Sequence, residues 1–326
     1  MTLPPPKISV IIPVHDRKEC IHQALDSLEL QSVQYDQFEV IIITNINLSN
    51  LNHYSFRLTV KHSTHLELSL KLIEGITESH GEVMCFLEDD DTFLQGKLQY
   101  VVDLFEYQDV SYYHNSLRYT GKHGGLINTH FPNTKREKEI RFVDPHKLMD
   151  DGLRSLFVQQ ADFNLSSISI RKDYFAQYLV LLQKMRVKYI DTFFFLCALS
   201  AGKAMAFGGP IFTNIKIHNR NASGSHRAGF KEITKIDKLG EIVTFIEILH
   251  ALIKTPLPVY EQWERMALLD DRLKGRKLSR TACAREIFDV FISYHGKLLR
   301  KDVAIKGVAY MIGPNFMNFI LKIFHE

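Results

Sequence analysis

The sequence predicts an α/β protein with a doubly wound, mostly parallel sheet and a helical C-terminal module. Short apolar, β-branched runs alternate with amphipathic helical patterns over residues 1–105, which is typical of such sheets. Beyond about residue 231 the strand-like runs stop and helical patterns follow, such as the apolar spacing of residues 242–249. We therefore expect two domains, an α/β domain at 1–230 and a helical domain at 231–326.

Each expected strand or helix rests on one of two periodic signals. Residues 8–12 form a short, continuous β-branched run that predicts a strand buried on both faces, and Pro13 ends it. Apolar residues at helical spacing predict an amphipathic helix over 18–30. The further expected elements are strands at 38–43, 83–87 and 165–170, helices at 68–79, 98–105 and 192–201, and polar loops at 120–139 and 219–229.

The composition fits an ordered globular protein. The 326 residues are 45% hydrophobic and 24% charged, which is enough apolar material for a full core. The formal net charge of +3 is too small to indicate nucleic-acid binding, so we expect no nucleic-acid partner. The four cysteines are scattered, which argues against a disulfide framework and for a reducing, cytoplasmic location. We expect neither a signal peptide nor a transmembrane helix, which needs about 18 apolar residues without charge.

Polar residues follow each of the first three expected strands. They are His15 and Asp16 after the first strand, Thr44 and Asn45 after the second, and the acidic run 88–91 after the third. Open α/β sheets bind ligands outside the carboxyl ends of their strands. This convergence therefore predicts a ligand site at that edge of the sheet.

The acidic run consists of Glu88, Asp89, Asp90 and Asp91. Four adjacent carboxylates at the end of a buried strand repel one another unless a cation compensates them. Magnesium and manganese take oxygen ligands and commonly sit between one or two carboxylates and substrate phosphates. The alternative, from the residues alone, is a solvated acidic turn that caps the next helix.

Four motifs follow one another along the chain. The first is S-V-I-I-P-V-H-D-R at residues 9–17, and the second is S-L-E-L-Q at 27–31. The third is G-E-V-M-C-F-L-E-D-D-D at 81–91, and the fourth is Asp191 before an apolar helix. In this order, over residues 7–220, they resemble the motifs of glycosyltransferase family 2.

The resemblance implies the GT-A fold and an inverting transfer of a sugar from a nucleotide-diphosphate donor to a hydroxyl of a glycan or lipid-linked acceptor. Residues 1–230 would then be the catalytic, nucleotide-sugar-binding domain. The family's cofactor would be Mn²⁺ or Mg²⁺, with Asp90 as the principal ligand. Asp89 would lie near the donor ribose, and Asp191 would be the general base that deprotonates the acceptor. The residues implied to line the nucleotide are Pro13, His15 and Asp16.

Two parts of this assignment have alternatives. Asp191 stands just before an apolar helix, which is also the position of a plain N-cap. His218 and Arg220 lie where the family often places a basic or histidine-bearing segment over the diphosphate. His218 could therefore ligate the metal and Arg220 could contact phosphate, or both could belong to an ordinary surface loop.

Three positions depart from the family pattern. The second strand ends in Thr44 and Asn45 where the family has D-D-G-S, so the usual evidence for uridine is missing, although either side chain could hydrogen-bond a base. Lys71 could supply the positive charge of the family's R-N-x-G pattern, or it could be a solvated helix residue. Glu88 replaces the first aspartate of the D-x-D motif, and we keep it as a second metal ligand.

The C-terminal part leaves several partners open. The basic run 272–280 and the apolar tail from Val303 could contact an anionic membrane, pack on the α/β domain or form a homo-oligomer. Two other functions also remain. A sugar-phosphate nucleotidyltransferase would need a glycine-rich loop after the first strand, and residues 13–17 lack one. A degenerate family member would bind a nucleotide or glycan without catalysis.

Overall fold

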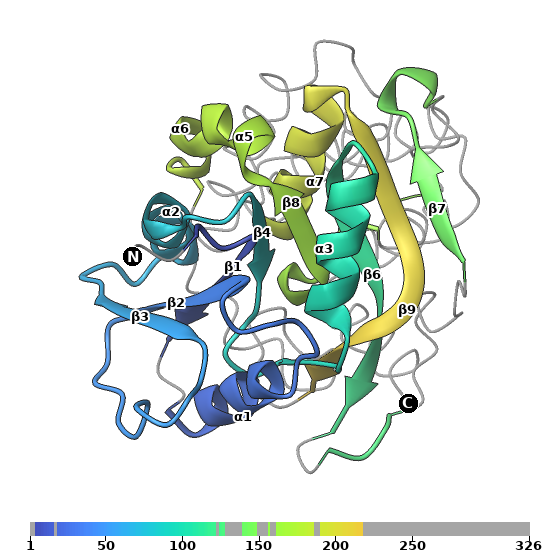
Figure 1. Ribbon diagram of the computed structural model, residues 1–326. Coiled ribbons are helices and arrows are strands. Elements are labelled where there is room, and N and C mark those ends of the chain that lie inside the picture. The colour runs from blue at the N-terminus through green and yellow to red at the C-terminus, as the bar shows by residue number, and fades with distance from the viewer. Residues whose placement is uncertain are drawn as a thin grey trace, which may run out of the picture. The chain divides into compact units, whose positions relative to one another are not determined.

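The computed structural model describes residues 4–15, 18–121, 124–127, 139–148, 156, 161–185 and 190–217. The chain separates into two compact units, Met1–His218 and Asn219–Glu326. The helical module expected at 231–326 lies outside the described residues, so the module and its predicted boundary stay predictions. The fold described here is that of the first unit (Figure 1).

A nine-stranded mixed sheet forms the centre of this unit, in the order β3-β2-β1-β4-β8-β6-β9-β5, with β7 paired to β9. β1 lies between β2 and β4 and runs parallel to both. β8 pairs antiparallel with β4 and β6, whereas β9 runs parallel to β6. The strands are β1 Ile8–Val14, β2 Phe38–Thr44, β3 Arg57–His62, β4 Val83–Phe86, β5 Thr92–Phe93, β6 Val110–Thr120, β7 Ile140–Val143, β8 Ile168–Arg171 and β9 Ala204–Lys216. Since β1, β2 and β4 are parallel neighbours, their carboxyl ends meet at one edge.

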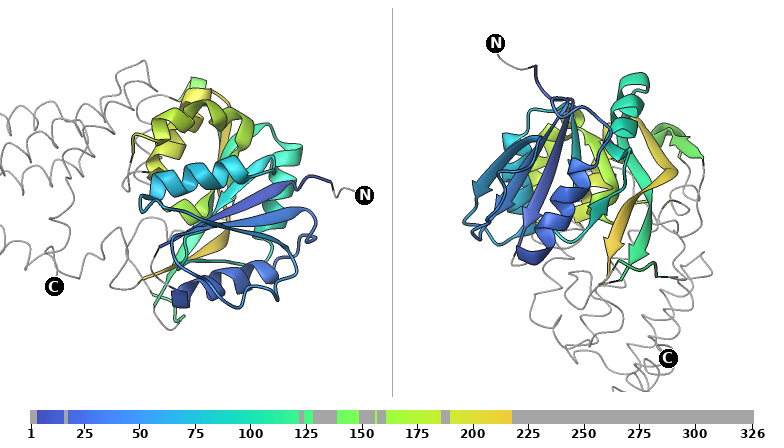
Figure 2. Two further views of the ribbon diagram at one scale, coloured as in Figure 1. Left: turned by 90° about the vertical axis from the view of Figure 1, so that its left-hand side faces the viewer. Right: turned by 60° about the horizontal axis from the view of Figure 1, so that its bottom comes forward.

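Helices cover both faces of the parallel strands, with α1 and α2 on opposite sides (Figure 2). Successive side chains of a strand point to opposite faces, and β1 shows the result. Val10 and Ile12 join the core that α1 and α3 share, whereas Ile11 faces α2, so close that a Cβ built on Gly75 would lie 2.5 Å from its Cγ2. The main helices are α1 Lys18–Glu29, α2 Leu68–Glu78, α3 Lys97–Tyr107, α5 Lys172–Phe175, α6 Leu179–Leu182 and α7 Ile190–Ala201.

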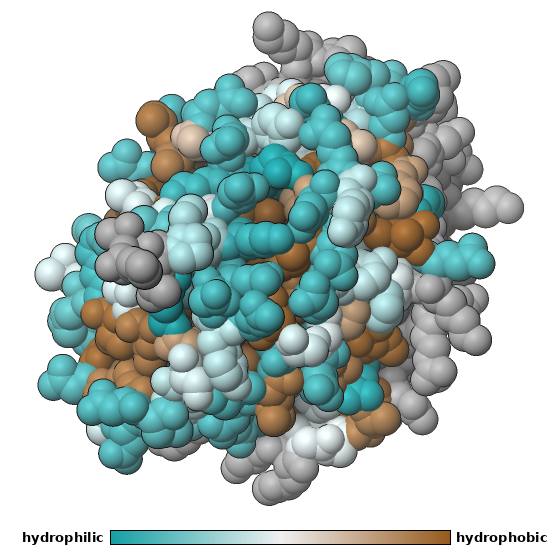
Figure 3. Space-filling view, in the orientation of Figure 1, coloured by the Kyte–Doolittle hydropathy of each residue, from teal (hydrophilic) through white to brown (hydrophobic). Residues whose placement is uncertain are grey.

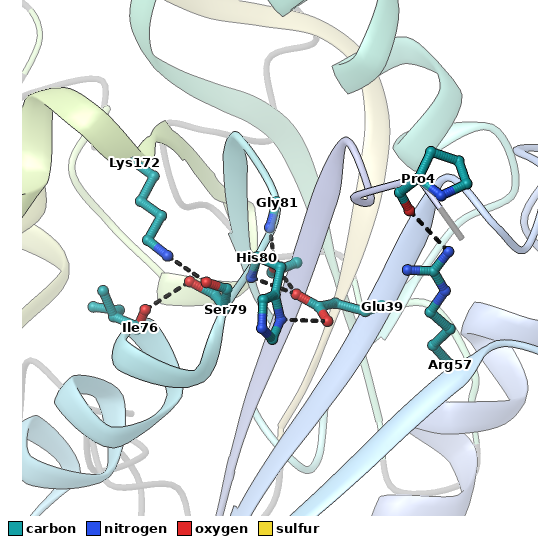
Figure 4. A network of polar contacts seen from close by, with 9 residues as sticks. Pro4, Glu39, Arg57, Ile76, Ser79, His80, Gly81 and Lys172 are labelled. Atoms are coloured by element: carbon teal, nitrogen blue, oxygen red, sulfur yellow. Dashed lines mark hydrogen bonds and ion pairs between the residues drawn. The ribbon is translucent and has the colours of Figure 1, made fainter. Parts of the chain in front are cut away.

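A network of hydrogen bonds links the chain segments at the amino edge of the sheet, where β1, β2 and β4 begin (Figure 4). The buried carboxylate of Glu39 accepts from Ser9 Oγ at 2.6 Å and from the His80 main-chain N–H at 2.6 Å. The Gly81 N–H donates to the same Ser9 oxygen at 2.8 Å. A Cβ on Gly81 would lie 2.5 Å from the Ser9 nitrogen, so only glycine allows this approach.

The structure confirms the α/β fold. Within two residues at their ends, it also confirms the strands expected at 8–12, 38–43 and 83–87 and the helices expected at 18–30, 68–79, 98–105 and 192–201. The strand expected at 165–170 begins with the 3₁₀ turn Leu165–Ser167 and continues as β8. Five strands, β3, β5, β6, β7 and β9, have no counterpart among the strands expected from the sequence. Most of the polar stretch expected as a loop at 120–139 lies outside the described residues.

Polar side chains predominate on the face of the molecule seen in Figure 3, and apolar side chains emerge between them. Among the described residues, no helix has the length and apolar character needed to cross a membrane. The basic run 272–280 and the tail from Val303, where membrane contact was considered, lie outside that part of the chain.

Candidate active site

The site lies at the carboxyl ends of β1, β2 and β4, as the polar residues after these strands predict. Register places Val14 of β1 opposite Thr44 of β2. Leu87 continues beyond β4, and its N–H donates to Ile11 O at 3.0 Å. The chain then turns directly into the acidic run. Three segments that are distant in the sequence therefore present polar groups along one edge.

Lys71 of α2 ties the ends of β1 and β2 together. Its side chain is fully buried, and Nζ donates to Val14 O at 2.7 Å and to Asn45 Oδ1 at 2.9 Å. His15 Nδ1 lies 3.3 Å from the same Nζ. The alternative of a solvated helix residue is therefore wrong. Lys71 is instead a buried cation among the strand ends.

The second strand ends in a tight turn. Thr44 Oγ1 donates to Ile46 O at 3.0 Å and accepts from Ile46 N at 3.1 Å, so its hydroxyl is engaged within the turn. Asn45 has its carbonyl oxygen toward Lys71, which leaves its amide nitrogen as the group that could reach a ligand. Pro13 is buried within β1.

The acidic run is held from two sides. The main-chain N–H of His15 donates to Asp89 Oδ2 at 3.1 Å, which fixes Asp89 against the end of β1. At the other end, Asp91 Oδ1 accepts from Lys216 N at 3.0 Å and Oδ2 accepts from Ser166 Oγ at 2.7 Å. The run is thus a structured turn and not a mobile acidic loop, and its three aspartates are buried.

Burial and mutual repulsion raise the pKa of two carboxyl groups in the run, Glu88 and Asp91. The pKa of Glu88 lies well above its ordinary value because of removal from water and, after that, the charges of Asp91 and Asp90. The pKa of Asp91 rises to about 7, first through burial and then through Asp90, although hydrogen bonds from Ser166 and Asn164 oppose the rise. A cation beside these groups would lower both pKa values.

The donor set suits a hard divalent cation shared with a phosphate. Every side chain of the run offers oxygen, the ligand atom that magnesium and manganese prefer. No three acidic, histidine or cysteine side chains of the described residues form a metal cage of their own. Such ions are often held by one or two carboxylates plus substrate phosphates. The residues present, with Asp90 and Glu88 as the expected ligands, therefore fit a metal that a diphosphate completes.

Asp191 lies in the first turn of α7, and its carboxylate is held by two main-chain groups. Oδ1 accepts from the adjacent Thr192 N at 2.9 Å, and Oδ2 accepts from Asn164 N at 3.1 Å. A plain N-cap side chain would bond the N–H groups two or three residues further along, so the observed geometry differs from that alternative. Burial raises the pKa of Asp191 against these two hydrogen bonds, and a raised pKa strengthens a carboxylate as a base.

Sequence reasoning missed four residues of this site. Asn164 and Ser166 contact the acidic run from the segment before β8. Asp162 accepts from Thr192 Oγ1 at 2.7 Å, and its pKa rises to about 7 through burial and the charge of Asp191. Lys97 is fully buried, and burial lowers its pKa to about 7. The only sequence signal was that polar residues cluster at the start of the strand expected at 165–170.

Three expected site residues lie outside the part of the chain that the structure describes. They are Asp16, His218 and Arg220. Their assignment to the nucleotide, the metal and the phosphate stays a prediction.

Comparison with known sequences agrees with the motifs. The family described as Glycosyl transferase family 2 matches residues 9–162. An uncharacterized glycosyltransferase of Haemophilus influenzae is 31% identical over 103 residues, which are 30% of this chain and 34% of that protein. One of Rickettsia bellii is 27% identical over 129 residues, or 38% of this chain and 18% of the relative. The chain therefore matches about a third or less of the length of these curated relatives.

Comparison with solved structures supports the fold. S. aureus TarS in complex with UDP-GlcNAc has a TM-score of 0.58 at 11% identity, with 98% of this chain and 91% of that chain covered. A mannosyltransferase of Pyrobaculum calidifontis in complex with GDP-Man and Mn²⁺ has a TM-score of 0.51 at 12% identity, with 97% and 83% covered. The α/β unit thus has the GT-A fold, and its residues 9–162 match the glycosyltransferase family 2 model.

Proposed function

We propose that the protein is an inverting, metal-dependent glycosyltransferase. It would move a sugar from a nucleotide-diphosphate donor to a hydroxyl of a glycan or lipid-linked acceptor in cell-surface polysaccharide or glycoconjugate synthesis. The observation that carries the proposal is the meeting of two acidic sites: the run after β4 and Asp191 of α7 both contact Asn164. A cytoplasmic protein at the inner face of a membrane would suit a lipid-linked acceptor.

The two acidic sites divide the chemistry of an inverting transfer. Asp191, a carboxylate of raised pKa, would take the proton of the acceptor hydroxyl. The acceptor oxygen would then bond to the anomeric carbon as the carbon–oxygen bond to the diphosphate breaks on the opposite face. Bound Mn²⁺ or Mg²⁺, with Asp90 and Glu88 as ligands, would supply charge neutralisation for the leaving diphosphate.

The remaining polar groups would bind and orient the donor. Lys71 places a buried cation beside His15 and Asn45, at the side of the site where β1 and β2 end. Asn45 would offer its amide nitrogen to the nucleotide, and Asp89, held by His15, would lie near the ribose. Solved structures with a similar fold contain UDP, UDP-GlcNAc or GDP-Man. This supports a nucleotide-sugar donor but does not specify its nucleotide base.

Thermal melting with a panel of donors tests the proposal. The protein would be mixed with Mn²⁺ and UDP- or GDP-linked sugars, and slow donor hydrolysis would be followed in parallel. We expect at least one donor to raise the melting temperature by several degrees in Mn²⁺ and not in EDTA, because a ligand that binds only the folded state stabilises it. Asp90→Ala should abolish both the shift and the hydrolysis.

Two outcomes would contradict the proposal. If no nucleotide sugar binds or is hydrolysed, the protein does not use such a donor and has another function. If Asp90→Ala matches the wild type, the acidic run does not hold the metal. Donor binding in Mn²⁺ without turnover on any acceptor would favour the degenerate, non-catalytic alternative.

A further inference from the structure

One residue contacts both acidic parts of the site. The side-chain Nδ2 of Asn164 donates to Glu88 Oε2 and to Asp91 Oδ2, each at 3.1 Å. Its main-chain N–H donates to Asp191 Oδ2 at 3.1 Å. We propose, on the basis of the function above, that Asn164 is a positioning residue that holds the acidic run and Asp191 at a fixed separation during transfer.

The chemistry of the asparagine amide fits this role. Two hydrogens on one nitrogen serve two carboxylates, and Oδ1 accepts from Ser167 Oγ at 3.3 Å, which fixes the orientation of the amide. Turning the amide over would place its carbonyl oxygen against Glu88 and Asp91. An aspartate of the same shape would add a further negative charge at this point.

The backbone of Asn164 is also unusual. Its φ of 72° is positive, and its ψ of 114° places it outside the left-handed helical region that asparagine tolerates, so the conformation is strained for any residue other than glycine. Glycine would adopt this conformation easily but would provide neither donor to the acidic run. The position therefore combines a strained backbone with a polar side chain, a combination that clusters at functional sites.

The segment that carries Asn164 is anchored on rigid elements. Lys97 Nζ of α3 and Thr213 Oγ1 of β9 donate to Ser166 O at 2.6 and 3.1 Å. His114 Nε2 of β6 donates to Phe163 O at 2.6 Å. All three donors are buried. The amide of Asn164 is thus presented from the sheet and its covering helix, which is what precise positioning of a reacting group requires.

Steady-state kinetics of Asn164→Gly test the inference. Glycine keeps the backbone conformation and the N–H toward Asp191 but removes both bonds to the acidic run. With Mn²⁺ and a donor found active for the wild type, we expect kcat to fall about 10- to 100-fold, because small misplacements of reacting groups cost that much. The donor KM and the Kd for the donor with Mn²⁺, measured by calorimetry, should change less than about threefold.

Two comparisons separate positioning from a general loss of structure. Asn50 also has a positive φ, 58°, but lies exposed, so Asn50→Gly should leave kcat and KM unchanged. Asn164→Gly should cost less than about threefold in kcat when Asp191 is already Asn, since the interaction it serves is then gone. Asn164→Asp keeps the shape of the side chain but replaces the donor nitrogen with an acceptor oxygen. It should lower kcat at least as much as Asn164→Gly.

The outcomes distinguish a failure of the positioning role of Asn164 from a failure of the proposed function. Wild-type kcat in both Asn164 variants, or effects that simply add to those of Asp191→Asn, would overturn the positioning role and leave the proposed function intact. A kcat loss accompanied by an equal loss of donor affinity would assign Asn164 to binding instead. Absence of Mn²⁺-dependent donor binding by the wild type would overturn both.

Discussion

The carboxylates at the two edges of the same sheet have different hydrogen-bonding surroundings. At the amino edge, Glu39 accepts from Ser9 Oγ and from the main chain of His80, and the His80 ring lies 3.2 Å away. At the carboxyl edge, Glu88 and Asp91 share the two hydrogens of one Asn164 amide. One edge surrounds a single acid with donors, and the other places several acids next to one another.

This difference shows which edge is built for stability and which for chemistry. A buried charge that is fully hydrogen-bonded fixes the geometry around it. Carboxyl groups crowded together with raised pKa values destabilise the folded chain until a cation or a proton compensates them, and such groups cluster at functional sites. We therefore expect substitutions at the carboxyl edge to cost activity and substitutions at the amino edge to cost stability.

The largest effect is expected for Asp191→Asn. The amide cannot take a proton from the acceptor, so kcat should fall by about 10²- to 10⁴-fold, the usual range for losing a general base. The donor Kd in Mn²⁺ and the circular dichroism spectrum should stay close to those of the wild type. An unchanged kcat would show that another group is the base, and Asp162 would be the first to examine.

Gly81→Ala should have the next largest effect, on stability. A Cβ at this position would lie 2.5 Å from Ser9 N and 2.6 Å from Ile8 C, and backbone atoms of a central strand cannot move aside easily. We expect a loss of about 3 kcal/mol in the free energy of unfolding, at the upper end for overpacking, measured by urea denaturation.

Gly125→Ala is the matched control for that substitution, because no atom lies within 4 Å of the added Cβ. Its stability should differ from the wild type by less than about 0.5 kcal/mol. Equal stability of Gly81→Ala and Gly125→Ala would show that the amino edge is looser than the structure implies.

The sequence predicted β1, β2 and β4 well because these strands are continuous, buried and mostly apolar runs, whereas β3 is partly exposed and partly polar and was missed. β6 and β9 escaped prediction for a physical reason. β6 contains His114 and Asn115, which look like loop residues but are buried and hydrogen-bonded to distant groups. β9 contains Gly208 and Gly209, both at positive φ, which read as a turn although the strand continues through them.

The site was predictable where residues follow strands and not where they depend on tertiary contacts. The acidic run could be found from its place after a strand, and Asp191 from the family resemblance. Asn164 could not, because its partners lie 27 to 76 residues away and its positive φ is not apparent from the sequence. The burial of Lys71 likewise depends on strand ends that the fold brings together.

The smallest effect is expected for the pH dependence of stability in Asp162→Asn, measured in EDTA. The pKa of Asp162 is raised from 3.8 to about 7 in the folded chain. Between these values the folded state binds the extra proton, so the free energy of unfolding falls as the pH rises. The neutral variant lacks this loss. It should therefore gain stability relative to the wild type as the pH rises from 4 to 8.

Asp144→Asn provides the opposite sign and so sharpens this test. The His146 N–H lowers the pKa of Asp144, so the wild-type carboxylate stabilises the fold above its ordinary pKa and this contribution is lost on acidification. Asp144→Asn should therefore lose stability relative to the wild type as the pH rises. Other shifted groups, such as His114, titrate in all three proteins and cancel in the differences. If the difference in the free energy of unfolding between Asp162→Asn and the wild type does not change with pH, then the pKa of Asp162 is not raised. Asp162 would then not belong to the group of crowded acids around Asp191.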